Sequence, residues 1–339
     1  MDARRPYPLY NTTFALHRLS PLYTSSENLS STVSLQHYAK SFRDILVGEV
    51  LRGVRVGLGS DQDALARVGA LQDVTWKLLP AEAIWDTEDD AGDELSVTIG
   101  ASRGIIVNIV YEKASYTAIL LRDRQTESAI LDGATGFEHF PLLLTRMPGS
   151  LRESFTGYLA SMFDTRASIL HLEKDYMVSA LEYYISDCSM GEDGEIMDAA
   201  SSARLLRTTV KDVQVVLGFD LVGPSLKSID VYFSKEDVPR LVQAGMKHIE
   251  AGNTPERPFM NTMSNYIRAN MALDLSHEMI KITKIACDAF VLSGQGKIKL
   301  IEPTPGNESV QNRATWNLVG GLIDVAKGSA LGTGKGNLG

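Results

Sequence analysis

Near its start the chain reads Pro8-Leu-Tyr-Asn-Thr-Thr-Phe-Ala-Leu-His-Arg-Leu-Ser-Pro-Leu-Tyr23, a stretch rich in aromatic and β-branched residues. Such a composition predicts a strand, and Pro21 closes it. The two-residue period of a strand puts Phe14 and Leu16 on one face and Ala15 and Leu19 on the other. Because both faces carry apolar side chains, we expect this strand to be covered on both sides.

The rest of the chain predicts strands in clusters, with helices between the clusters. Four β-rich runs follow one another in residues 95–131, and their short links predict antiparallel pairing, since a parallel pair needs a longer crossover. Further strands are predicted at 209–217, 225–233, 279–292 and 297–301. Helices are predicted over 32–50, 150–163 and 174–186, after Ser234, and from Pro258 onward. Strands that cluster in this way indicate the α+β class with a mainly antiparallel sheet.

Composition along the chain predicts four regions. Residues 1–186 form an N-terminal α+β region with the β-meander, and 187–205 form an acidic linker. Residues 206–302 form a C-terminal α+β region that carries the last strands of the chain. Residues 303–339 form a flexible tail with room for a short helix, because Gly, Asn and Ser are frequent there.

Hydrophobic runs and cysteine content indicate in which compartment the protein resides. No run approaches the roughly 20 apolar residues that span a bilayer, and Met1-Asp-Ala-Arg-Arg-Pro6 is not followed by the apolar core of a secretory signal. We therefore expect no membrane association. Cys188 and Cys287 are the only cysteines, which fits a reducing compartment such as the cytosol or the nucleus.

The formal net charge of −9 at first argues against a nucleic-acid partner, but the acids are concentrated. Residues 81–94 contain seven acids and no base, and residues 187–198 contain five acids and no base. Without these twelve acids the chain has 30 acidic and 33 basic residues, a net charge of +3. The remaining body could therefore present a basic face, although acidic runs are usually no more than solvated loops.

Catalytic interpretations find little support. Gly334-Lys335 lacks the first glycine and the Ser or Thr of a phosphate loop, and the six histidines show no metal-ligand spacing. Cys287 with His277 is the best nucleophile and base that the chain offers, yet Cys287 lies in an apolar strand pattern typical of a buried, inert thiol. An enzyme with a dispersed site is the alternative class. A free-standing DNA-binding module is a third, disfavoured by the net charge and the absence of known motifs.

Basic residues give a candidate site. Lys297 and Lys299 share one face of a predicted terminal strand, and Lys281 or Lys284 joins that face if the strands pair as a hairpin. Two interpretations stay open: the lysines protect an exposed strand edge, or they contact phosphates without reading sequence. A second candidate set is Arg52, Arg55, Arg122 and Arg124.

Three blocks of the sequence resemble the centromere protein L (CENP-L) family, in particular its fungal members. They are residues 8–23, residues 140–166 beginning Phe140-Pro-Leu-Leu-Leu, and residues 273–300 beginning Leu273-Asp-Leu-Ser-His. The resemblance implies a broad, curved antiparallel sheet with helices packed on it. It also implies a non-enzymatic structural subunit of the inner kinetochore, the constitutive centromere-associated network, that needs no cofactor and resides in the nucleus at the centromere.

The same resemblance implies the partners. Members of the family pair with centromere protein N, act with other inner-kinetochore subunits, and help to link centromeric nucleosomes and their DNA to the kinetochore for chromosome segregation. We expect the strand at 297–301 to lie at an open sheet edge and to add to a partner sheet, because an open edge offers unpaired N–H and C=O groups. Its apolar contacts would come from Ile298, Leu300 and Ile301.

Overall fold

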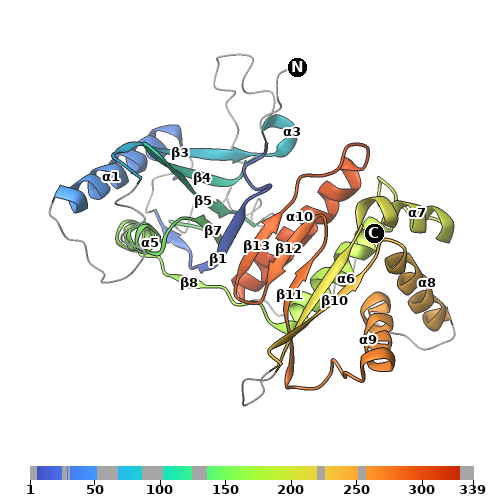
Figure 1. The fold of residues 1–339 in the computed structure, drawn as a ribbon. Coiled ribbons are helices and arrows are strands. Elements are labelled where there is room, and N and C mark those ends of the chain that lie inside the picture. The colour runs from blue at the N-terminus through green and yellow to red at the C-terminus, as the bar shows by residue number, and fades with distance from the viewer. Residues whose placement is uncertain are drawn as a thin grey trace. The chain divides into compact units, whose positions relative to one another are not determined.

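The computed structural model describes residues 6–24, 29, 31–51, 68–85, 102–123, 136–219, 226–250 and 257–328 (Figure 1). Within this part the chain forms two compact units. The first is built mainly from residues 14–170 and also contains 323–328. The second is built mainly from residues 171–322 and also contains 8–13. The four regions predicted from the sequence stay a prediction.

The first unit is built on an antiparallel sheet. Neighbouring strands follow the order β1 (Thr13–Leu19), β7 (Leu142–Arg146), β5 (Ser115–Leu121), β4 (Ser102–Tyr111) and β3 (Leu71–Pro80), and β8 (Ala167–Ile169) pairs with the other side of β1. Two short strands, β2 (Leu22–Tyr23) and β6 (Phe137–Glu138), pair separately, and α3 (Glu82–Trp85) follows β3.

Helices α1 (Thr32–Leu51) and α5 (Gly149–Phe163) close the core of this unit. Phe42 of α1 lies 5.4 Å from the ring of Phe155 of α5, and Trp76 of β3 lies 6.0 Å from the same ring. Rings at these separations add specific contacts to the buried area that they provide. Gly104 has a φ of +157°, and a Cβ there would lie 1.9 Å from the carbonyl oxygen of Leu120, so only glycine fits.

The second unit is built on five antiparallel strands within the described residues. Their order is β10 (Ser228–Phe233), β9 (Val213–Phe219), β11 (Ile280–Ala286), β12 (Phe290–Ser293) and β13 (Lys297–Leu300). Its helices are α6 (Lys174–Cys188), α7 (Ala199–Thr209), α8 (Asp237–Glu250), α9 (Pro258–Met271) and most of α10 (Glu308–Lys327). Helix α6 packs against β11 and against α7 and α9, and it lies behind the strands in Figure 1.

This architecture confirms the predicted α+β class and the mainly antiparallel pairing. The helices predicted at 32–50, at 174–186 and from Pro258 are α1, α6 and α9. The strand predicted over 279–292 is two strands, β11 and β12, joined by a turn at residues 287–289. Among the described residues, no helix is long and apolar enough to cross a membrane.

Candidate functional site

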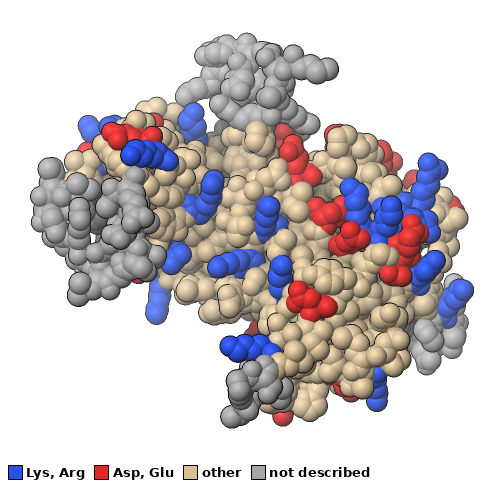
Figure 2. Space-filling view, viewed as in Figure 1, with Lys and Arg blue, Asp and Glu red and all other residues tan. Residues whose placement is uncertain are grey.

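The candidate site lies on the sheet of the second unit, which buries only one of its faces. Along β9, β11 and β13 the side chains alternate between buried and accessible, as they do in a sheet with a core on one side. The buried face carries Val215, Leu217, Ile282, Ile285 and Phe290, all at most 4% exposed. The opposite face carries the lysines. Figure 2, viewed from the same side as Figure 1, shows separate Lys and Arg side chains, with some Asp and Glu among them, on an otherwise uncharged surface over these strands.

Strand register brings four predicted lysines together on that opposite face. Lys284 pairs with Ser293 of β12, and Ser293 pairs with Lys297 of β13, so these three residues form one row across the sheet. Directly opposite residues share a face and have Cβ atoms about 4.5–5.5 Å apart. Lys299 and Lys281 lie in the neighbouring rows, opposite Val291 and Gly218. We call the surface formed by Lys281, Lys284, Lys297 and Lys299 the lysine face.

A β-bulge makes this grouping possible. Lys281 and Lys284 are three residues apart, and in a regular strand they would point to opposite faces. The register with β9 shifts between Ile282 and Lys284, which leaves Thr283 as the extra residue. The Thr283 hydroxyl donates to the carbonyl oxygen of Val216 at 3.2 Å. As a result both lysines lie on the same face.

A polar network crosses the lysine face toward β10. The Lys284 Nζ donates to Gln214 Oε1 at 3.4 Å, and Gln214 Nε2 donates to Asp230 Oδ2 and to the Tyr232 hydroxyl, each at 2.8 Å. Asp230 is the acidic residue of this network. Neither Lys297 nor Lys299 has an ion-pair partner among the described residues, so the face carries a net positive charge.

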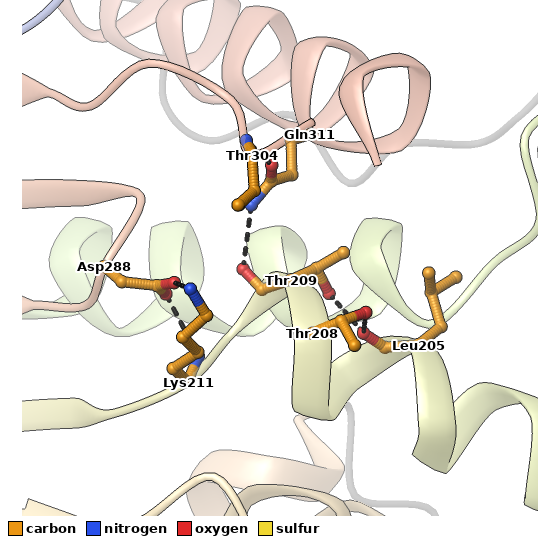
Figure 3. A network of polar contacts seen from close by, with 7 residues as sticks. All are labelled: Leu205, Thr208, Thr209, Lys211, Asp288, Thr304 and Gln311. Atoms are coloured by element: carbon orange, nitrogen blue, oxygen red, sulfur yellow. Dashed lines mark hydrogen bonds and ion pairs between the residues drawn. The ribbon is translucent and has the colours of Figure 1, made fainter. Parts of the chain in front are cut away.

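Polar contacts at the ends of these strands join β9, the β11–β12 turn and α10 (Figure 3). The backbone N–H of Lys211 donates to Asp288 Oδ1 at 3.0 Å, and the Lys211 Nζ lies 3.6 Å from Asp288 Oδ2, which joins the start of β9 to the turn between β11 and β12. Gln311 of α10 is buried and donates to the carbonyl oxygen of Thr209 at 3.2 Å, while it accepts from the N–H of Thr304 at 2.6 Å. The buried Gln311 amide thus has partners for both of its polar atoms and avoids the cost of an unsatisfied buried group, while the more exposed Lys211–Asp288 contacts add a local tie between β9 and the β11–β12 turn.

Of the predicted arginine set, Arg122 lies within the described residues. Arg122 belongs to the first unit and is 8% exposed; its guanidinium lies 3.4 Å from the Glu138 carboxylate and 5.0 Å from the centre of the Phe140 ring. These contacts give Arg122 a structural role in this chain. Arg52, Arg55 and Arg124 lie outside the described residues.

The expectation that residues 297–301 form an open edge strand is wrong. Strand β13 pairs with β12 on one side, and on the other side Leu300 forms a bridge with Tyr10 and accepts from the N–H of Asn11 at 2.7 Å. Ile298 and Leu300 are 1% and 2% exposed on the buried face, and Ile301 is half-buried. Contact of a partner with Ile298, Leu300 and Ile301 stays a prediction, and the burial of Ile298 and Leu300 does not favour it. Among the described residues the end strand of the second unit's sheet is β10, which sequence reasoning did not single out.

Cys287, the nucleophile considered from the sequence, is an unreactive thiol in the structure. Cys287 is buried, and this burial raises the pKa of its thiol to about 12, so the thiolate that would attack a substrate is not formed near neutral pH. His277 is exposed, and its Nδ1 accepts from the N–H of Met279 at 3.2 Å within a turn. Within the described ranges no group of three His, Cys, Asp or Glu residues is arranged to hold a metal ion.

A sheet with a core on one face and basic side chains on the other offers a surface of the kind that binding subunits use. The family comparison gives the particular family: the model for centromere protein L matches residues 8–327, and the chain belongs to this family. It is a non-catalytic family of the kinetochore, located at the centromere, and membership implies a structural role in the inner kinetochore. No curated protein gives a significant match to the chain.

Proposed function

We propose that this protein is a structural subunit of the inner kinetochore that pairs with a centromere protein N homologue and helps to link centromeric DNA to the kinetochore through its lysine face. Family membership supports the setting and the class of partner. The observation that carries the DNA contact is the grouping of Lys281, Lys284, Lys297 and Lys299 on one exposed face. Ammonium groups bind phosphate oxygens as point charges and do not read bases.

Position in the sheet separates the two interpretations of these lysines. Edge protection applies to strands with an unpaired side. The lysines lie on β11 and β13. Strand β11 lies between β9 and β12, and β13 pairs with β12 on one side and is bridged to Tyr10 through Leu300 on the other. Protection of an edge thus does not explain them, and phosphate contact is the better interpretation.

The experiment begins with co-expression of the chain and the centromere protein N homologue of the same organism. Co-elution in size-exclusion chromatography is the expected result, and separate elution would contradict the pairing.

DNA affinity of the complex is then measured against salt for wild type and for a variant with Glu at Lys281, Lys284, Lys297 and Lys299. Each lost phosphate contact lowers the salt slope by about 0.9, so four contacts lower it by up to roughly 3.6.

A matched control keeps the same change in net charge away from the lysine face. Lys235, Arg240, Lys247 and Arg268 are exposed on or beside α8 and α9. Replacing these four residues with Glu should weaken DNA binding less and leave most of the salt slope. Equal affinities and slopes for both variants would show that the lysine face does not contact DNA.

A further inference from the structure

Several hydroxyl residues of the chain follow an arginine by two positions, a spacing that many basophilic serine/threonine kinases read. Such kinases hold the arginine with carboxylates, and charge patterns of this kind decide which substrates a kinase accepts. Spacing alone does not show whether a kinase can reach the hydroxyl, so the structure has to separate the sites. The six residues with this spacing are Ser20, Thr126, Ser154, Ser168, Thr209 and Thr315, of which Thr126 lies outside the described residues.

Burial and local structure set aside four of the sites that the structure describes. Thr209 and Thr315 are 0% and 4% exposed, so a kinase could reach their hydroxyls only after local unfolding. Ser154 lies within α5, whereas protein kinases bind the segment around the acceptor in an extended form. Ser20 is half-buried, and its hydroxyl is hydrogen-bonded to that of Thr165 at 3.0 Å. Ser168 is the site that remains.

Ser168 is both accessible and extended. It is the middle residue of β8, its side chain is exposed, and within the described residues β8 pairs with β1 alone. Its hydroxyl has no hydrogen-bond partner among these residues. The arginine that a kinase would read, Arg166, is exposed as well. Ile169, which follows the acceptor, is 57% exposed and could enter the apolar pocket that many such kinases place after the acceptor.

Two arginines share a face of the sheet with Ser168. Arg18 of β1 lies directly opposite Ser168, and directly opposite residues share a face. The pairing continues past β8, where the N–H of Ser20 donates to the carbonyl oxygen of Arg166 at 3.1 Å, so Arg166 lies on that face too. Arg18 Nη2 donates to the carbonyl oxygen of Val325 at 3.0 Å, and a guanidinium has five N–H donors, so others remain for a new acceptor.

We propose that Ser168 is a phosphorylation site for a serine/threonine kinase that reads Arg166, and that the phosphate is held by Arg18 and Arg166. The Ser168 Oγ attacks the γ-phosphorus of ATP, the bond from that phosphorus to the β–γ bridging oxygen breaks, and ADP leaves. The hydroxyl proton passes to the catalytic aspartate of the kinase. A phosphate opposite arginines forms charge-assisted hydrogen bonds, which here would tie β8 to β1. Neither the partner nor DNA takes part, so the test is independent of the proposed function.

The acceptor is tested on the full-length chain with ATP and the catalytic subunit of the cyclic-AMP-dependent protein kinase, and the phosphate is located by mass spectrometry. Ser154 is the matched control, because it has the same spacing from an arginine and is also followed by an apolar residue, Phe155. We expect Ser168 to be modified at least about tenfold faster than Ser154 in the folded chain, since Ser154 must first leave its helix. Ser168→Ala should lose nearly all of the phosphate.

Synthetic peptides separate the effect of sequence from that of the fold. Peptides of residues 148–158 and 162–172 have no helix or sheet to protect them, so both should be modified at similar rates. The proposal is overturned if the 162–172 peptide is not a substrate, if the folded chain takes no phosphate at Ser168, or if the folded chain takes it equally fast at Ser168 and Ser154.

The receiving arginines are tested by ³¹P NMR of the phosphorylated chain. The second pKa of phosphoserine is about 6, and nearby positive charges lower it. The phosphate should therefore titrate at a lower pH in the chain than in the phosphorylated 162–172 peptide, and Arg18→Gln should remove most of this difference. Arg240→Gln, a change at an exposed arginine of α8, should leave it unchanged. Equal titration midpoints for chain and peptide would overturn the pairing with Arg18 and Arg166.

Discussion

At the scale of single residues, one extra residue in β11 decides the composition of the lysine face. The two-residue period predicts Lys297 and Lys299 on one face, and the register confirms that they share it. It also predicts that either Lys281 or Lys284 joins them, whereas the bulge at Thr283 lets both join. Gly218 accommodates this bulge, because a Cβ there would lie 2.6 Å from Thr283 Cγ2. Bulges depend on the partner strand, so the sequence of β11 alone could not reveal it.

Glu182 is a second residue whose role the sequence hides. It is buried on α6, and its carboxylate oxygens accept the N–H groups of Phe259 and Met260, at 3.1 and 2.8 Å. These donors belong to the first turn of α9, whose N-cap residue Arg257 makes no side-chain cap. Glu182 thus caps α9 from another helix and satisfies groups that the helix itself leaves unpaired. Its burial raises its pKa, while the two N–H groups and Arg257 act in the opposite direction.

We predict that Glu182 makes the stability of the chain depend on pH. A carboxyl group whose pKa is raised by folding stabilises the folded state when it is protonated, and this contribution is lost as pH rises from about 4.5 through the raised value. Glu182→Gln does not titrate. The urea concentration at the midpoint of unfolding should therefore decrease for wild type, relative to Glu182→Gln, as the pH is raised from 4 to 7. A difference between the two midpoints that does not change with pH would contradict the prediction. Glu182→Ala should be less stable at every pH, by about 1–3 kcal/mol, because the two N–H groups lose their acceptor.

At the scale of elements, the sequence predicts those with strong local signals and misses those fixed by distant contacts. Helix α9 begins at Pro258, as predicted, because proline suits the first helical position. Helix α7 lies in the predicted acidic linker; its signal was Asp198, which caps it by accepting the N–H groups of Ala200 and Ser201. Strand β13 has no local signal of its interior position, because Tyr10 and Asn11, almost 300 residues away in sequence, occupy its second side.

We predict that the crossing of α8 and α9 depends on Gly245. A Cβ at Gly245 would lie 2.3 Å from the carbonyl oxygen and 2.6 Å from the carbonyl carbon of Pro258, and neither backbone atom can move without moving α9. Alanine normally stabilises a helix by about 1 kcal/mol relative to glycine. Gly245→Ala should instead destabilise the chain, by about 1–3 kcal/mol, in urea unfolding.

Glycines in open space provide the control for this crossing. Gly157 of α5 and Gly320 of α10 have no atom within 4 Å of an added Cβ. Their replacement by alanine should be neutral or stabilising, by up to about 1 kcal/mol. If the Gly245→Ala variant is as stable as these two variants, α8 and α9 can move apart to accept the added methyl group without a loss of stability.

At the scale of the whole molecule, the local charge of the lysine face is opposite in sign to the net charge of the chain. The chain carries −9, yet the lysine face is basic. The acids of residues 187–198 are held on the surface by α10: the guanidinium of Arg313 donates to the carbonyl oxygens of Asp187, Met190, Gly191 and Glu192. In the first acidic run only the first few residues, which include Glu82 of α3, lie within the described part of the chain. Net charge acts over longer distances than contacts do, so a negative net charge would oppose the approach of DNA to the lysine face if that face makes the contact proposed above.

We predict that neutralising the second acidic run raises DNA affinity at low salt only. Glu192, Asp193 and Glu195 have exposed side chains, so the triple change to Gln, Asn and Gln should leave the fold intact and change the net charge from −9 to −6. Repulsion between separated charges is screened over about 10 Å at 0.1 M salt and over about 3 Å at 1 M. The gain in DNA affinity of the partner complex should therefore be several-fold at about 50 mM salt and should disappear toward about 0.5 M salt.

The isolated chain should bind DNA weakly in both forms, since its overall charge stays negative. A gain that persists at high salt would mean that these acids contact the DNA path directly, and no gain at low salt would mean that the long-range field of the protein does not govern DNA binding.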